Sequence, residues 1–239
     1  MTLNIKKTHS ERLMPLIDRI LVESGLERET LGAVAASSGP GSFTGLRIGV
    51  STARALAQGL GIPAVPVCTL SAMAEAVPAP GVLICPLFDA RRSQVYTALF
   101  QRSLHPPHHL ETVLEPQALA LDELVEVIKS DPCLEGRQRA SGGRPDQEIR
   151  ISEDGPPVAV VFTGEGLHSY EDELKKALPG RAVITSAPFR LCRAALVALR
   201  GRVLLEENPN ASYLEVRPQY LRRPEAERKA APKEGGPKP

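Results

Sequence analysis

The segment from Ser38 to Gly45, Ser-Gly-Pro-Gly-Ser-Phe-Thr-Gly, has the residue types that most directly suggest chemistry. A glycine-rich turn between a buried strand and a helix presents free backbone N–H groups and can bind phosphate. The segment is not a Walker A loop, because it lacks Gly-Lys-Ser/Thr, and it lacks the Gly-x-Gly-x-x-Gly spacing of a dinucleotide site. Two interpretations stay open: an anion contact, or a tight turn in which Ser42 or Thr44 caps the following helix.

Two further turns carry candidate binding residues. Gly164-Glu165-Gly166 follows a buried strand and resembles turns that approach nucleotides, although a lone Gly-x-Gly is a weak signal. Asp89, Arg91 and Arg92 stand at the bend of a predicted hairpin, where they form either an anion or partner site or a self-capped turn with solvated arginines. The residues predicted as weak nucleotide or anion contacts are Gly39, Gly41, Ser42, Thr44, Gly164 and Gly166.

The histidines and cysteines do not have the spacing of a metal or hydrolase site. His105, His108 and His109 flank two prolines, which excludes the helical His-Glu-x-x-His arrangement and favours a solvated loop. No Gly-x-Ser-x-Gly motif indicates a serine hydrolase. We therefore expect neither catalytic nor metal-binding residues. Four cysteines without a Cys-x-x-Cys pair indicate reduced thiols in a cytoplasmic protein: Cys68, Cys85, Cys133 and Cys192.

The elements that would position these residues alternate between strands and helices. Thr8 and Glu11 have capping-box spacing ahead of a helix over 8–24, in which Pro15 predicts a kink or a later start. Thr69 is a candidate cap for a helix through Ala76. Further helices are predicted over 43–60, 121–128, the segment after 166, and 190–207; strands over 31–37, 62–67 and 158–164; and a hairpin around 89–92. This order favours an α/β fold with mixed sheets.

The helix over 43–60 has two different faces. Its polar stripe contains Arg47, Ser51, Arg54 and Gln58, whereas Gly45, Gly49 and Thr52 form a stripe of small residues. A smooth face of this kind suits close packing against another helix. Packing within the chain and contact with another subunit both remain open at this point.

Composition limits the function classes. The 239 residues are 42% hydrophobic and 24% charged, which is typical of a soluble globular chain, and no stretch is apolar enough to cross a membrane. The net charge of +1 gives no global attraction for nucleic acid, and nine Phe and Tyr residues without Trp provide few stacking platforms. Polar residues over 131–157 predict an exposed insertion. The tail over 223–239 is predicted to be disordered, and the excess of Lys and Arg over 216–239 would either contact nucleic-acid phosphates or stay solvated.

Several motifs together resemble one bacterial family. They are HSERLMPLID at 9–18, SSGPGSFTGLRIGVSTARALAQGLGIP at 37–63 with CTLSAMA after it, FDARRSQVY at 88–96 and PQYLRR at 218–223. In this order they resemble the TsaB family, also called YeaZ, of tRNA threonylcarbamoyladenosine biosynthesis proteins. The resemblance extends from about residue 5 to 229 and is weakest over 102–157.

The resemblance implies a two-lobed fold of the actin, Hsp70 and sugar-kinase type, with mixed sheets and flanking helices. The first lobe would comprise 1–78 and 190–222, and the second lobe 79–189. TsaB chains ordinarily open with a segment of the type ILALDTST and two further strands, whereas only MTLNIKK precedes the first helix here. We therefore expect an incomplete first lobe, from either a misassigned start or a real truncation.

The resemblance also implies a function. TsaB proteins act as non-catalytic scaffolds that pair with TsaD, the subunit that transfers threonylcarbamoyl to the tRNA adenosine 3′ of the anticodon, and that allow TsaE to join. TsaD has two histidines four residues apart, whereas here Leu13 stands four residues after His9. The partner interface is predicted to contain Leu13, Ile17, Ile20, Arg47, Ile48, Gly49, Ser51, Thr52 and Ala55.

The resemblance also bears on other partners, on cofactors and on activity. The same helices would allow a homodimer, tRNA would be contacted indirectly, and no membrane contact is expected. We expect no cofactor on this chain alone and leave ATP binding by the complex open. The alternative is an enzyme in its own right, either an ATP-dependent transferase or a peptidase-like hydrolase.

Overall fold

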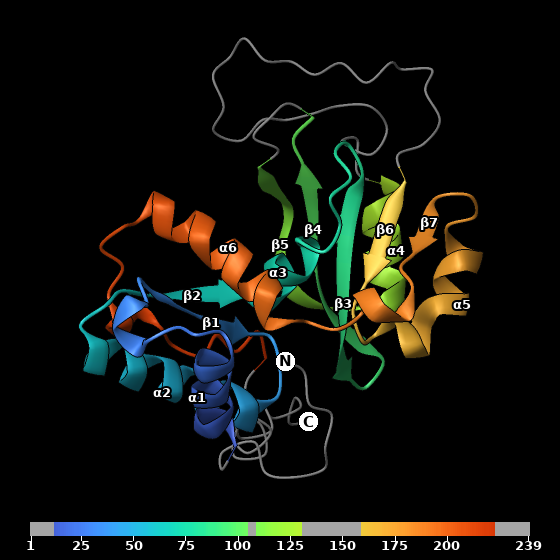
Figure 1. Ribbon diagram of the computed structural model, residues 1–239. Coiled ribbons are helices and arrows are strands. Elements are labelled where there is room, and N and C mark those ends of the chain that lie inside the picture. The colour runs from blue at the N-terminus through green and yellow to red at the C-terminus, as the bar shows by residue number, and fades with distance from the viewer. Residues whose placement is uncertain (1–11, 105–108, 131–158, 223–239) are drawn as a thin grey trace, which may run out of the picture.

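Two sheets organise the computed structural model, which describes residues 12–104, 109–130 and 159–222 (Figure 1). Within these residues the first sheet is a parallel pair, β1 (Val34–Gly39) and β2 (Ala64–Cys68). The second sheet has the order β5-β4-β3-β6-β7. Its strands are β3 (Leu83–Arg91), β4 (Gln94–Arg102), β5 (Leu110–Ala120), β6 (Val160–Thr163) and β7 (Ala182–Ile184). β3, β4 and β5 pair antiparallel, and β3, β6 and β7 pair parallel, so the predicted mixed sheet is confirmed.

The first sheet lies between two helices, α2 (Phe43–Leu60) and α6 (Ala194–Glu207), one on each face (Figure 1). Successive side chains of a strand point to opposite faces. Accordingly, Ala36 packs in a cluster with α2, whereas Ala35 packs in a cluster with α6. Because helices cover both faces of the first sheet, β1 and β2 are mostly apolar and almost free of charged residues.

Gly201 allows α6 to approach the first sheet closely. A Cβ atom at this position would lie 2.5 Å from the Cβ of Ala35, a separation that side chains do not tolerate. Val65 and Val67 of β2 each have a methyl group 3.5 Å from the same point. Glycine is thus required here by lack of space, and its position in the middle of a helix is otherwise unfavourable.

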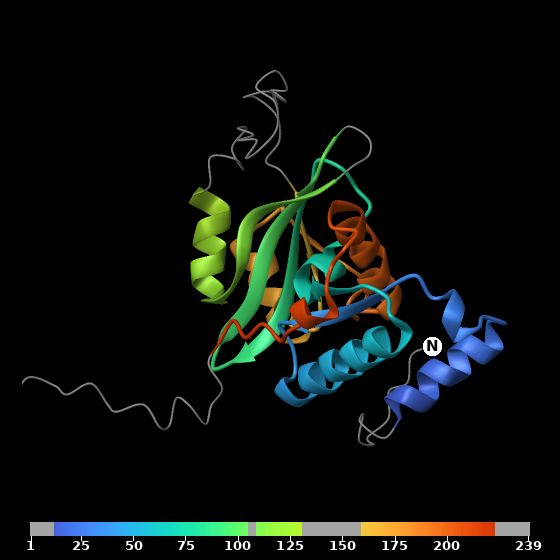
Figure 2. The same ribbon diagram turned by 90° about the vertical axis from the view of Figure 1, so that its left-hand side faces the viewer.

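Helices also cover both faces of the second sheet. α4 (Leu121–Ser130) and α5 (Leu167–Ala177) share one apolar cluster with β3, β4 and β6. The short helix α3 (Thr69–Ala74) packs through Leu70 and Ala74 against the opposite face. Figure 2 shows α4 on the outer side of the strands and α3 on the inner side, toward the first sheet. Because every residue of α3 is buried, this helix is the shared core between the two sheets.

An ion-pair cluster next to α3 connects three elements. Glu75, which follows α3, accepts a hydrogen bond from Arg102 of β4 at 2.8 Å and lies 4.0 Å from the guanidinium of Arg200 on α6. All three side chains are less than one-fifth exposed. The Glu75 carboxylate therefore links α6, which packs on the first sheet, to β4 of the second sheet.

Some boundaries differ from the predicted ones. α1 (Leu13–Glu23) begins after Arg12, and Pro15 lies in its first turn, where a missing N–H has no effect on the helix. The later start that Pro15 predicted is confirmed, while Thr8 and Glu11 lie outside the described residues. Thr69 was wrongly predicted as a cap: it is the first residue of α3, and Cys68 precedes it without a side-chain cap bond. α6 begins at Ala194, four residues later than predicted.

The sequence did not predict β5 or β7. β5 contains Pro116, which cannot donate a backbone hydrogen bond and is tolerated because β5 is an edge strand. The pairing of β5 with β4 is irregular around Leu99, opposite this part of β5. β7 has only three residues. Short 3-10 turns complete the described fold: η2 (Arg28–Thr30), η3 (Ala187–Phe189) and η4 (Tyr213–Glu215).

The close approach at Gly201 can be tested by adding volume. We expect Gly201→Val to lower the free energy of unfolding by about 2 kcal/mol, because the added atoms overlap Ala35. Gly201→Ala combined with Ala35→Gly should recover part of the loss that Gly201→Ala causes alone. Gly59→Ala is the control, since its Cβ would meet nothing, and should stabilise by about 0.5–1 kcal/mol. Urea unfolding measures all four variants, and an unchanged Gly201→Val protein would contradict the packing.

Candidate functional site

A groove lies between α1 and the C-terminal half of α2, with a volume of about 560 Å³. Figure 2 shows α1 beside this end of α2, away from both sheets. The lining combines small and apolar residues with one arginine: Met14, Arg28, Ser51, Thr52, Ala55, Leu56, Gly59 and Leu60. Ser51, Thr52 and Ala55 are among the predicted interface residues. Of the predicted small-residue stripe, Thr52 lines the groove, whereas Gly45 and Gly49 do not.

α1 buries little of its apolar surface. Leu21 is its one buried residue among those described, and the predicted interface residues Leu13 and Ile17 are half-buried. Ile20 is 40% exposed and Val22 is 79% exposed. An amphipathic helix normally turns such residues toward a core. Ile20 and Val22 are two residues apart and point to opposite sides of the helix, so α1 offers apolar side chains on both of these sides.

On α2 the predicted interface residues occupy several environments. Ile48 and Gly49 are half-buried, and no heavy atom lies within 4 Å of a Cβ placed on Gly49. None of the described residues fills the space next to Gly49, so it is open with respect to this part of the chain. Ser51 and Ala55 are exposed and Thr52 is half-buried along the groove.

Arg47 is engaged within the chain. Its Nε donates to the hydroxyl of Tyr220 at 3.1 Å, and its guanidinium carbon lies 4.0 Å from the ring centroid of Phe43. The rings of Phe43 and Tyr220 stack with centroids 5.0 Å apart. The backbone N–H of Gln219 donates to the carbonyl of Ser38 at 2.7 Å. Together these contacts attach the segment after η4 to the start of α2.

The glycine-rich turn before α2 has a structural explanation. Ser42 accepts a hydrogen bond from the N–H of Gly45 at 3.4 Å, which confirms Ser42 as the cap, while Thr44 lies inside the first turn. Gly39 has φ +134°, and its Cβ would lie 2.4 Å from the carbonyl oxygen of Gln219. Gly41 has ordinary space next to Leu46. The need for glycine arises from protein backbone, and the anion contact stays a prediction.

Protein backbone also occupies the space next to the glycines of the second glycine-rich turn, Gly164 and Gly166. Gly164 has φ +105°, and a Cβ there would lie 2.3 Å from the carbonyl oxygen of Leu87 on β3. Gly166 donates its N–H to the same oxygen at 3.0 Å. Both glycines thus serve the junction of β6 with β3, and a nucleotide contact at this turn also stays a prediction.

The thiols are held in their protonated form. Burial raises the pKa of Cys85 to about 12 and that of Cys192 to about 11. Burial also raises the pKa of Cys68. A thiolate is the nucleophilic form of cysteine, so these side chains are poor nucleophiles at neutral pH.

The described residues contain neither a metal-binding cluster nor a membrane-spanning helix. Over 12–104, 109–130 and 159–222, no three His, Cys, Asp or Glu residues gather in a way that could hold a metal ion. No helix in the same ranges is long and apolar enough to span a membrane. His109 is exposed, whereas His9, His105 and His108 lie outside the described residues.

Known proteins match nearly the whole chain. A family profile described as "TsaD: tRNA N6-adenosine threonylcarbamoyltransferase" matches residues 4–230. The "tRNA threonylcarbamoyladenosine biosynthesis protein TsaB" of Bacillus subtilis is 31% identical over 225 residues, covering 94% of this chain and 84% of that protein. The chain belongs to the TsaB/YeaZ family. The TsaB protein of Haemophilus influenzae is 28% identical over 221 residues, covering 91% of this chain and 81% of its own length.

A solved structure of the TsaB/YeaZ family shares the fold. YeaZ from Pseudomonas aeruginosa superposes with a TM-score of 0.64 at 21% sequence identity, covering 91% of this chain and 86% of that chain. The α/β fold with mixed sheets and flanking helices that the sequence predicts is thereby confirmed, whereas the likeness to the actin and Hsp70 type stays a prediction. The division into lobes at residues 78 and 190 stays a prediction.

The interface predicted for this TsaB/YeaZ protein omits part of the groove lining. Leu56 and Gly59 follow Thr52 and Ala55 at the four-residue helical spacing, so extending the small-residue stripe would have found them. No comparable pattern in the sequence indicates that Met14 and Arg28 line the groove. Their place depends on how the chain folds back after α1, where Arg28 pairs with Asp18 at 2.9 Å.

The protonated thiols lead to a test of reactivity. In a Cys133→Ser variant, which leaves the three described cysteines, we expect reaction with Ellman's reagent at pH 8 to be about a hundredfold slower than for a free thiol. Burial favours the neutral thiol of Cys192. Its contribution to the free energy of unfolding is therefore complete below pH 9 and is lost as the pH rises toward about 11. Rapid labelling of the native protein at pH 8 would contradict the burial, and labelling in denaturant gives the full count.

Proposed function

We propose that this protein is a non-catalytic subunit in the formation of threonylcarbamoyladenosine on tRNA, and that it pairs with the catalytic subunit TsaD in the cytoplasm. The names of its curated TsaB relatives and the TsaD family profile support the pathway. The observation that carries the pairing is the surface of α1 and α2 that the other described residues leave uncovered, with its apolar side chains and its groove.

The chemistry of this surface suits a helix of another subunit. Ile20, Val22 and Met14 provide apolar area at α1, and the small residues of α2 allow a second backbone to come near. Arg28, which also lines the groove, is paired with Asp18, so this ion pair would border the partner's helix. The partner interface is thus proposed to contain the predicted residues Leu13, Ile17, Ile20, Arg47, Ile48, Gly49, Ser51, Thr52 and Ala55.

The remaining assignments follow from this arrangement. TsaE would join after the pair has formed, and a homodimer would use the same helices when TsaD is absent. No cofactor is assigned to this chain, and ATP is left to the assembled complex. The described thiols are kept protonated by burial, which argues against the alternative of an enzyme with a cysteine nucleophile.

Gly49 gives a clean test of the interface. Because no atom lies within 4 Å of its Cβ position, Gly49→Leu should leave the fold intact and should abolish co-purification with TsaD. Unfolding curves check the first expectation, and a pull-down with tagged TsaD checks the second.

The matched control is Ala198→Leu, which adds similar bulk to an exposed position of α6. This control should bind TsaD like the unaltered protein. A Gly49→Leu protein that folds and still forms the complex would overturn the proposed interface.

A further inference from the structure

The turn that joins β3 to β4 has an unusual backbone. Arg91, Arg92 and Ser93 have φ of 62°, 56° and 57°, so three consecutive residues other than glycine adopt the left-handed conformation. Hairpin turns that need this conformation usually use Asn or Gly. Asp89 accepts a hydrogen bond from the N–H of Arg91 at 2.6 Å, which confirms that it caps its own turn. Residues kept in a costly conformation are typical of functional positions.

The two arginine side chains of this turn are available. Both are exposed, and among the described residues neither guanidinium forms an ion pair or a hydrogen bond. The backbone therefore places two adjacent cations at the tip of the hairpin, and no ion pair or hydrogen bond with the described residues accounts for them.

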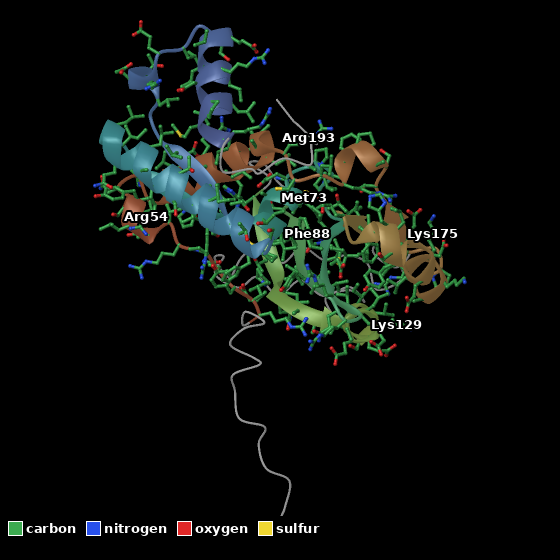
Figure 3. The ribbon with its side chains drawn as sticks, turned by 90° about the horizontal axis from the view of Figure 1, so that it is seen from below. Arg54, Met73, Phe88, Lys129, Lys175 and Arg193 are labelled. Atoms are coloured by element: carbon green, nitrogen blue, oxygen red, sulfur yellow. The ribbon has the colours of Figure 1, made fainter. Side chains whose placement is uncertain are left out.

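The C-terminal segment brings further groups to the same tip. Arg222 donates to the carbonyl of Ala90 at 2.9 Å, and Tyr220, two residues earlier, is 39% exposed. Stacking on Phe43 and the hydrogen bond from Arg47 fix the Tyr220 ring in place. In the view from below (Figure 3), Phe88 at the base of this hairpin lies near the centre, and Lys175 of α5 lies at the far edge.

The two segments that meet at the tip carry a net positive charge although the whole chain is nearly neutral, and the exposed carboxylates beside the tip, Asp122 and Glu123, belong to α4. In the two segments that meet, 88–93 and 219–222, three arginines accompany a single acidic residue, Asp89. Asp89 is occupied by the backbone of its own turn. Guanidinium groups next to an exposed aromatic ring are the combination that binds a phosphate backbone and stacks on an unpaired base.

We infer that the tip surface, defined as Arg91, Arg92, Tyr220 and Arg222, contacts single-stranded RNA, with the arginines on phosphates and Tyr220 against a base. This inference rests on the proposed function, in which tRNA is the substrate of the assembled complex. It differs from the expectation that this chain touches tRNA only indirectly, and it uses a surface outside the α1–α2 groove.

The test uses the complex of this chain with TsaD and a fluorescent, unmodified tRNA transcript. Replacing Arg91 and Arg92 together by Ala should weaken binding several-fold at low salt. It should also reduce the slope of log K against log salt by about 1.5, because two phosphate contacts are lost. Arg91→Lys with Arg92→Lys should keep the slope, since both charges remain.

Lys175→Ala with Lys176→Ala is the matched control, because it removes two charges from α5, away from the tip. Each complex is first checked for assembly by size-exclusion chromatography, which separates this inference from the proposed function. An assembled Arg91/Arg92 double variant with unchanged affinity and slope would overturn the inference. So would loss of assembly in that variant, which would assign the tip to a protein partner.

Discussion

The packing of α6 on the parallel strands β1 and β2 is the interaction on which the rest of the fold depends. Two parallel strands are not stable without helices on their faces. α2 follows β1 directly in the chain, but α6 arrives only after the entire second sheet, and Gly201 lets it approach Ala35. α6 covers the second face of the first sheet. The C-terminal part of the chain must therefore return to the sheet that the N-terminal part forms.

This return determines where both candidate surfaces lie. After α6, Tyr213 and Val216 pack in the core between α2 and the first sheet, which directs the next residues toward Ser38 and then toward the β3–β4 hairpin. The C-terminal segment thus spans from one sheet to the other. α1 does not take part in this return and remains at the periphery, where its apolar residues are uncovered.

Local chemistry explains what could be predicted from the sequence. α2 has the predicted bounds, because Ser42 caps its start and Gly61, with φ 65°, ends it. The hairpin was predicted from alternating apolar residues around a polar turn. Thr69 was mistaken for a cap, because the apolar Cys68 at the true cap position gives no signal. The role of Gly201 depends on Ala35, far away in sequence, and the tip surface depends on the docking of Tyr220 and Arg222. Neither contact leaves a local pattern.

The strand β5 bears on how the protein behaves at high concentration. An open strand edge is a template on which another chain can add, and unprotected edges lead to amyloid-like association. In β5, Pro116 interrupts the row of donors, the irregular pairing around Leu99 distorts the strand, and Glu111 and Glu115 are exposed. The residues that made β5 hard to predict as a strand therefore also protect its edge from pairing with further copies, and among the described residues no other strand pairs with this edge.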